Sequence, residues 1–224
     1  MQPRNLRHVM DVRISSREAA VAAQLAGARI LPVATVDDVN QVERLCHALS
    51  GGGLPLIEIA FRSEVAVEAV RRASRVEGCL VGAGTVLSPA QAEAALAAGA
   101  SFAVAPGTNV DVVAACRELG LPFFPGVATP SEIERARQLG LRTLKVFPAA
   151  QLGGPAFLRA VTATYPDMQF MPTGGVGPEN LRDYLSVPSV LAVGGSWLVR
   201  PELLQEGRFD EVERLAREAL ELVG

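Results

Sequence analysis

Short apolar runs recur along this sequence at a spacing that suits one strand followed by one helix. The runs start roughly 20–26 residues apart, and helical patterns fill the gaps between them. They lie at Ile30–Val36, Leu54–Phe61, Cys79–Thr85, Phe102–Pro106, Pro122–Val127, Thr143–Pro148, Gln169–Thr173 and Val190–Trp197. Eight such units predict an α/β fold, a (β/α)8 TIM barrel with an extra N-terminal helix over Ser15–Ala28 that crosses its bottom. A doubly wound open sheet is the alternative, but no glycine-rich dinucleotide fingerprint follows the first run.

Local signals place the helices within this repeat. Ser88–Gln91 and Thr129–Glu132 have the pattern of capping boxes with proline at the first helical position. Gly99, Gly120 and Gly140 follow helical patterns, as residues that close a helix do. No linker or charge run divides the chain. We therefore expect a single domain over residues 1–224, with residues 1–14 as an N-terminal arm.

Composition excludes several classes of partner. The formal net charge of -3 leaves no basic stripe, so a nucleic-acid partner is not expected. No signal peptide is predicted in Met1–Ile14, and the apolar stretch Ala19–Val36 is interrupted by polar residues, so no membrane association is expected. The three cysteines are scattered and form no C-x-x-C pair, which predicts buried, reduced thiols and a cytoplasmic protein.

Lysine is nearly absent from this chain. Of 21 basic residues, Lys145 alone is a lysine. A general bias toward arginine explains the other positions but not this one. Arginine cannot replace lysine where a neutral amine is needed, because guanidinium stays protonated and forms no imine. Lys145 is therefore a candidate nucleophile.

Alternation along the strands brings other polar side chains toward Lys145. In the second run Glu58, Ala60 and Arg62 are expected to point into the barrel, as are Thr143, Lys145 and Phe147 in the sixth. Thr85 ends the third run on its inward face. Catalytic residues of a barrel lie where its strands end, so these side chains are predicted to converge on one cavity.

Each of these residues also has a structural interpretation. Glu58 and Lys145 would make a buried ion pair, and Arg62 would be a solvated strand end. Burying two charges is costly, which favours a functional role. An apolar cavity near a second cation disfavours the ammonium form, so the free amine can attack a ketone. Glu58 would then move protons, and the planar guanidinium of Arg62 would bind a substrate carboxylate.

Two glycine-rich segments follow the seventh and eighth runs. Thr173–Gly177 leads to Pro178 at a predicted helix start, and Gly194, Gly195 and Ser196 end the last run. Barrels commonly bind phosphate at these two places through backbone N–H groups. The alternative is that both segments are ordinary tight turns. No cluster has metal-ligand spacing, and His8 and His47 lie outside the strand ends, so neither a metal nor a cofactor is expected.

The sequence resembles the 2-keto-3-deoxy-6-phosphogluconate (KDPG) aldolases, which also act on 4-hydroxy-2-oxoglutarate. The resemblance runs from ILPVATV to the last helix through IEIAFRS, VGAGTVL, FAVAPG, LKVFPA, MPTGGV and VGGSWLV. It implies a class I aldolase with Lys145 as the Schiff-base residue and Glu58 as the general acid/base. It further implies a homotrimer. The part of the site for the pyruvyl and hydroxyl-bearing carbons of the substrate would be Arg62, Thr85, Pro106, Phe147 and Thr173. The part for the phosphate would be Gly174, Gly175, Gly194, Gly195 and Ser196.

The chain departs from the family pattern at two positions. Members typically read EVTLRT and SPG where this sequence has Ala60 and Ala105. The loss of two hydroxyls predicts a changed preference among keto-acid substrates. Three hypotheses follow: a KDPG aldolase, a Schiff-base aldolase for 4-hydroxy-2-oxoglutarate or the galactonate analogue, and a non-catalytic barrel that binds phosphosugars.

Overall fold

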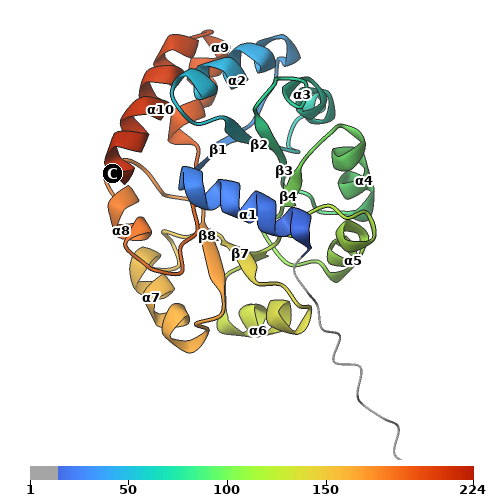
Figure 1. Cartoon of the computed structure of the whole chain (residues 1–224), viewed down its shortest axis with the longest axis vertical. Helices are drawn as coiled ribbons and strands as arrows, with labels where there is room; N and C mark the ends of the chain where they lie inside the picture. Colours follow the sequence, from blue (N-terminus) through green and yellow to red (C-terminus); the bar gives the residue numbers. More distant parts are fainter. Residues whose placement is uncertain (1–14) are drawn as a thin grey trace, which may run out of the picture.

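Strands and helices alternate along the chain, and the helices surround the strands (Figure 1). The computed structural model describes residues 15–224, so the predicted N-terminal arm, residues 1–14, lies outside the described residues. The strands are β1 (Ile30–Ala34), β2 (Leu56–Ala60), β3 (Leu80–Gly84), β4 (Phe102–Val104), β5 (Phe123–Phe124), β6 (Gly126–Val127), β7 (Thr143–Val146), β8 (Gln169–Pro172) and β9 (Val193–Gly195). The α-helices are α1 (Ser16–Ala28), α2 (Val42–Gly51), α3 (Ala66–Ala73), α4 (Pro89–Ala97), α5 (Val110–Glu118), α6 (Pro130–Gln138), α7 (Gly154–Thr164), α8 (Leu181–Leu185), α9 (Pro201–Gln205) and α10 (Phe209–Val223), with the 3-10 helices η1 (Val39–Gln41) and η2 (Trp197–Val199).

The strands form a curled, parallel arrangement. One sheet has the order β5-β4-β3-β2-β1-β9, and a second has the order β6-β7-β8. All strand pairings within residues 15–224 are parallel. A single residue, Pro125, separates β5 from β6, and an isolated bridge joins Thr173, after β8, to Gly194 in β9. The predicted α/β class is therefore confirmed, with two parallel sheets that approach each other at both ends.

Most predicted runs extend one or two residues beyond their strands, and three predictions are wrong for a specific local reason. The run Pro122–Val127 is two short strands, because Pro125 has no N–H with which to continue the ladder. The run Val190–Trp197 is a strand only over Val193–Gly195, since the chain turns into η2 at Trp197. No helix starts at Pro178: residues 178–180 form a turn, and α8 begins at Leu181.

Helix α1 closes the end of the sheet where the strands begin. Its N-cap is Ser15, whose hydroxyl accepts a hydrogen bond from the N–H of Glu18. Val21 and Leu25 are buried, and the helix ends next to the start of β1. In Figure 1 it crosses in front of the strands. The predicted N-terminal helix is thus present, one residue shorter than predicted because Ser15 caps it.

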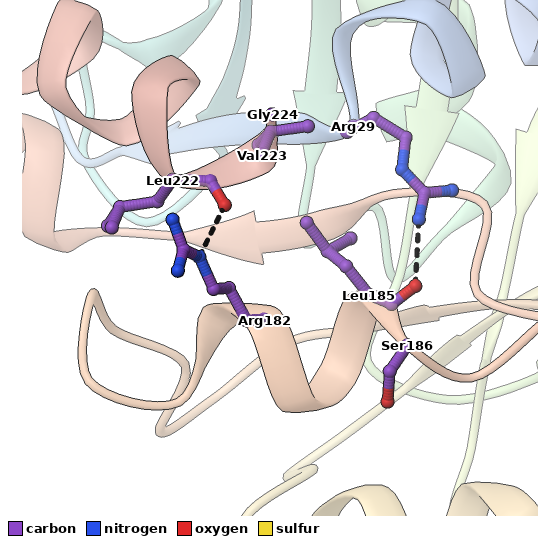
Figure 2. Close-up of a pocket in the computed structure, with 7 residues that line it drawn as sticks. All are labelled: Arg29, Arg182, Leu185, Ser186, Leu222, Val223 and Gly224. Carbon is purple, nitrogen blue, oxygen red and sulfur yellow. Dashed lines mark hydrogen bonds between the residues drawn. The ribbon is translucent and has the colours of Figure 1, made fainter.

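Two arginines reinforce the same end of the molecule. Arg29, between α1 and β1, donates hydrogen bonds to the carbonyls of Leu185 (2.9 Å) and Val190 (3.0 Å). Arg182 donates to the carbonyl of Leu222 at 2.9 Å. Both side chains line a cavity of about 320 Å³ (Figure 2). Arg29 therefore connects the start of β1 to the end of α8, and Arg182 connects α8 to the end of α10.

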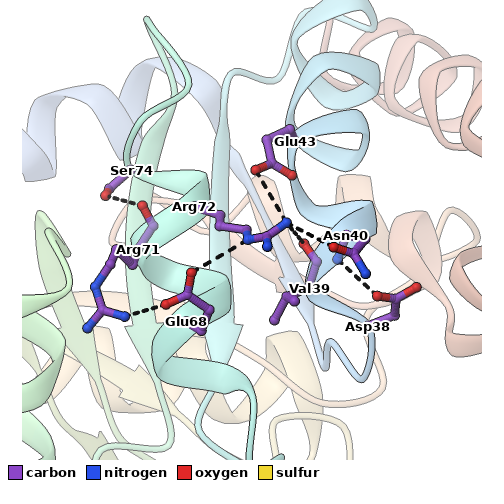
Figure 3. A network of polar contacts seen from close by, with 8 residues as sticks. All are labelled: Asp38, Val39, Asn40, Glu43, Glu68, Arg71, Arg72 and Ser74. Carbon is purple, nitrogen blue, oxygen red and sulfur yellow. Dashed lines mark hydrogen bonds and ion pairs between the residues drawn. The ribbon is translucent and has the colours of Figure 1, made fainter.

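A network of charged side chains joins α2, η1 and α3 on the outside of the molecule (Figure 3). Arg72 forms ion pairs with Glu68 (3.5 Å) and Glu43 (3.8 Å) and donates a hydrogen bond to Asn40. Glu68 also pairs with Arg71. Exposed pairs of this kind each contribute about 0–1 kcal/mol to stability. The network therefore adds little to stability, and we assign it no functional site.

The predicted helix caps are largely confirmed. Thr129 and Glu132 form a complete capping box at the start of α6. Ser88 accepts from the N–H of Gln91, but the Gln91 side chain accepts from Leu87 rather than Ser88, so this box is incomplete. The glycines predicted to close helices all have positive φ angles, namely Gly99 (94°), Gly120 (64°) and Gly140 (80°).

The cysteines are free thiols. Cys46 and Cys116 are buried, whereas Cys79, the residue before β3, is only half-buried. The prediction of burial is therefore wrong for Cys79. Burial raises the pKa of the Cys116 thiol to about 11. Within residues 15–224, no helix has the length and apolar character needed to cross a membrane.

Candidate active site

Lys145 and Glu58 meet in the interior between the two sheets. Lys145 lies on β7, in register with Gly126 on β6 and Met171 on β8. Glu58 lies on β2, and its Oε1 is 3.2 Å from the Nζ of Lys145. The side chains are 6% and 2% exposed, respectively. The inward orientation predicted for both residues is confirmed, and they form a buried ion pair across 87 positions of sequence.

Gly84, at the end of β3, makes room for the Glu58 carboxylate. A Cβ atom at this position would lie 2.3 Å from Oε1 of Glu58. The next residue, Thr85, has a φ of 58°, which is a strained conformation for a β-branched side chain. Gly84 is not among the predicted site residues, because a glycine that fits against a side chain from another strand leaves no local signal in the sequence.

We predict that Gly84→Ala lowers turnover while the protein remains folded. The added methyl group would displace the Glu58 carboxylate from Lys145, and a displacement of about 1 Å lowers rates by up to about 10²-fold. Steady-state kinetics would measure the loss. Gly27→Ala is the matched control, because a Cβ there meets nothing within 4 Å. Equal activity of the two variants would contradict this role for Gly84.

A cavity of about 290 Å³ opens beside Lys145. It contains eight of the predicted site residues: Arg62, Lys145, Phe147, Thr173, Gly174, Gly175, Gly194 and Ser196. Glu58, Thr85, Pro106 and Gly195 are predicted site residues that do not line it. Glu58 contacts the cavity through Lys145, and Pro106 packs its carbonyl against Gly126. The structure thus brings together most, but not all, of the predicted site.

Five further residues line the cavity without having been predicted. They are Val33, Thr35, Val176, Val199 and Pro201. Val33 and Thr35 come from the end of β1, where alternation places them on the inward face. That pattern would have identified them. Val199 and Pro201 follow η2, whose path could not be predicted from the apolar run.

The charges of the cavity are unevenly distributed. Arg62 and Lys145 are the charged residues among those that line it, and Glu58 compensates Lys145. Arg62 is exposed and forms no ion pair with any carboxylate of residues 15–224. The Nζ of Lys145 lies 5.8 Å from the centre of the Phe147 ring. The cavity therefore presents one uncompensated guanidinium near a buried amine, which suits an anionic carbonyl compound.

The two glycine-rich segments differ in why they need glycine. Gly174 and Gly175 have positive φ angles of 95° and 75°, so they form a turn that other residues would strain. A Cβ on Gly194 would lie 2.3 Å from Oγ1 of Thr173, and one on Gly195 would lie 1.8 Å from the Trp197 ring. The interpretation as tight turns therefore fits the first segment, where a Cβ on Gly175 would also lie 2.4 Å from the Cβ of Ala150, while the second needs glycine for close packing alone.

The first segment presents backbone amides to the cavity. The carbonyls of Thr173 and Gly174 accept hydrogen bonds from Ala149 (2.9 Å) and Ala150 (3.0 Å). The N–H groups of residues 174–176 donate no hydrogen bond to any acceptor in residues 15–224. Unsatisfied amides in a glycine turn form a concave site for an anion. No group of three or more potential metal ligands occurs within the described part of the chain.

Comparison with known proteins gives a consistent result. The family model described as KDPG and KHG aldolase matches residues 21–215. The 2-dehydro-3-deoxy-phosphogluconate aldolase of Haemophilus influenzae is 40% identical over 205 residues, which cover 91% of this chain and 96% of that protein.

Two solved structures share the fold along most of their length. The KDPG aldolase of Legionella pneumophila, with pyruvate captured as a covalent carbinolamine, has a TM-score of 0.85 at 34% identity and covers 88% of this chain and 97% of its own. The 2-keto-3-deoxy-6-phosphogluconate aldolase of Zymomonas mobilis ZM4, with 3-phosphoglycerate, has a TM-score of 0.84 at 33% identity and covers 92% and 96%.

Proposed function

The chain belongs to the KDPG and KHG aldolase family, and on this premise we propose that it cleaves 2-dehydro-3-deoxy-6-phosphogluconate to pyruvate and D-glyceraldehyde 3-phosphate. The observation that carries the proposal is the Lys145–Glu58 pair: the only lysine of the chain is buried beside a cavity, 3.2 Å from a carboxylate. A class I aldolase requires such an amine with an adjacent proton-transfer group.

The reaction follows from the positions of these two groups. Glu58 takes a proton from Lys145, and the free amine attacks the C2 carbonyl of the substrate to form a carbinolamine. Glu58 returns the proton to the leaving hydroxyl, so that water departs and an iminium remains. The iminium accepts the electron pair of the C3–C4 bond as Glu58 removes the proton of the C4 hydroxyl. The aldehyde leaves, and Glu58 returns the proton to C3 of the enamine. Water then adds at C2 of the resulting iminium, which releases pyruvate and restores the ammonium group of Lys145.

The family resemblance assigns the other predicted residues their roles in this proposal. Arg62 binds the substrate carboxylate with help from Thr85, while Pro106 and Phe147 bound the pyruvyl group. Thr173 contacts the hydroxyl-bearing carbons. Gly174, Gly175, Gly194, Gly195 and Ser196 hold the phosphate, with Gly195 acting through the packing of Trp197. The free amides of residues 174–176 support this part of the proposal.

Two alternative functions lead to different expectations. Cleavage of 4-hydroxy-2-oxoglutarate or the galactonate analogue keeps the same chemistry and changes the aldehyde half. The missing hydroxyls at Ala60 and Ala105, both buried, favour a changed substrate range. A non-catalytic phosphosugar-binding barrel is the distant alternative. The burial of an ion pair argues against it, because desolvating both groups costs several kcal/mol per ion without any functional return.

The proposal extends to architecture and assembly. The approach of the two sheets at Pro125 and at the Thr173–Gly194 bridge supports a closed (β/α)8 barrel, in which β5 and β6 count as one strand of a single domain. Leu87 and Val110 are large apolar side chains that are 52% and 39% exposed, and they support the homotrimer that the family resemblance implies. Free thiols support a cytoplasmic location.

Trapping with borohydride in the presence of pyruvate tests the proposed function. We expect one reduced adduct per chain, and because the chain has one lysine, peptide mass spectrometry should find it at Lys145. The N-terminal amine is the internal control. Its adduct should increase in proportion to the pyruvate concentration, whereas the adduct at Lys145 should saturate. Active, folded protein that gives no pyruvate-dependent adduct would exclude the Schiff base.

A further inference from the structure

The side chain of Asn180 connects two ends of the amide-bearing turn that follows β8. Its Oδ1 accepts a hydrogen bond from the N–H of Gly177 at 3.0 Å, and its Nδ2 donates to the carbonyl of Gly175 at 2.9 Å. Asn180 does not itself line the cavity, whereas Gly174, Gly175 and Val176 do. The Asn180 side chain thus connects Gly175 to Gly177 without lining the cavity.

The position of Asn180 makes this arrangement unusual. It is the N-cap residue of α8, where an asparagine side chain ordinarily accepts a hydrogen bond from the first turn of the helix. Here it makes no such bond. Its hydrogen-bonding capacity is directed back to the turn instead of forward to the helix. A role in stabilising the helix alone does not account for these hydrogen bonds to Gly175 and Gly177.

The turn needs such a restraint because its conformation is costly. Gly174 and Gly175 both have positive φ angles, and glycine has the largest backbone freedom to lose. On the opposite side the turn is held by the hydrogen bonds from Ala149 and Ala150. Without the Asn180 side chain, the carbonyl of Gly177 would keep the hydrogen bonds from the N–H groups of residues 180 and 181, but the N–H of Gly177 and the carbonyl of Gly175 would lose their partner. The N–H groups of residues 174–176, which have no acceptor within residues 15–224, would then lose part of what fixes their orientation.

We propose that Asn180 is a positioning residue for the phosphate group of the substrate: it holds Gly175 and Gly177 so that the amides of residues 174–176 converge on one anion. The proposal rests on the proposed function for the identity of the substrate. It adds a residue that acts through the backbone and contacts neither substrate nor Lys145. Preorganised amides bind an anion without reorganisation, which is why a restraint outside the cavity affects affinity.

The test compares Asn180→Ala, Asn180→Asp and the control Ser186→Ala. Ser186 donates to the carbonyl of Asp183 at the other end of α8, so its loss weakens the same helix without touching the turn. Asn180→Asp keeps the acceptor but loses the donor, and adds a charge beside Glu179, whose carboxylate lies against Gly177. This second variant keeps the test valid if Asn180→Ala does not fold.

For Asn180→Ala we expect KM for the phosphorylated substrate to rise about tenfold with kcat little changed, which corresponds to about 1.4 kcal/mol. KM for unphosphorylated 4-hydroxy-2-oxoglutarate, borohydride trapping of pyruvate at Lys145 and the Ser186→Ala kinetics should stay as in the wild type. Asn180→Asp should raise the phosphorylated KM at least as much. The dissociation constant of inorganic phosphate, measured by calorimetry, should rise with that KM.

Equal changes for both substrates, or an unchanged KM for the phosphorylated one, would overturn the inference. So would wild-type protein that does not bind inorganic phosphate. Failure of the proposed function is distinguishable from failure of this inference. In that case the wild-type protein itself would give no pyruvate adduct.

Discussion

Lys145→Arg should reduce turnover by a factor on the order of 10⁴–10⁶, the scale seen when a covalent nucleophile is removed. The guanidinium group stays protonated and cannot attack a carbonyl, although it keeps the positive charge that faces Glu58. The expected loss is therefore in kcat, and borohydride should trap no pyruvate on any side chain. Kinetics on purified, folded protein and intact mass measure both effects.

A reciprocal substitution controls for general amine reactivity. Arg142 lies just before β7, and its side chain is 39% exposed and pairs with Asp167 at 3.8 Å. Arg142→Lys introduces an accessible amine outside the cavity. In the double variant with Lys145→Arg, that amine should neither restore turnover nor carry a stoichiometric pyruvate adduct. Full turnover by Lys145→Arg alone would refute the Schiff-base mechanism and favour the phosphosugar-binding alternative.

Glu58→Gln should lower kcat by about 10²–10⁴-fold, the share of a general acid/base. The amide has the shape of the carboxylate but cannot take up the protons that move during carbinolamine breakdown, bond cleavage and enamine protonation. Lys145 remains present, so pyruvate should still be trapped, only more slowly. Single-turnover trapping rates and kcat should therefore fall while the final stoichiometry of the adduct stays the same.

Stability must be followed with this variant, because removing one member of a buried ion pair costs roughly 3–5 kcal/mol if the other stays charged. Thermal unfolding separates this effect from catalysis. Glu68→Gln is the matched control, since Glu68 pairs with Arg71 and Arg72 on the surface. Its kcat should be that of the wild type. A Glu58→Gln variant with normal kcat would remove Glu58 from the mechanism.

Much of this site could be predicted because strand geometry is encoded locally. Alternation alone orients Glu58 and Lys145 inward, and the repeat of apolar runs places each within a strand that borders the same interior. The scarcity of lysine is by itself enough to indicate which residue is the candidate nucleophile. The positive φ angles of Gly99, Gly120 and Gly140 were equally predictable, since each glycine follows a helical pattern.

What could not be predicted depends on contacts between distant segments. Gly84 matters because of a carboxylate on β2, and Gly195 because of the Trp197 ring. An asparagine ahead of a helix has the pattern of a cap, and only the folded turn shows that the Asn180 side chain points the other way.

The burial of Lys145 also affects how readily the aldehyde product can modify this protein. Aldehydes condense with primary amines, so an enzyme that releases an aldehyde exposes its own lysines to slow, damaging modification. Here the single lysine side chain is 6% exposed and lies inside the site, and every other basic side chain that could meet solvent is an arginine or a histidine. On the proposed reaction, the outside of the protein thus offers the aldehyde product no lysine amine, and the one available is the amine that catalysis uses.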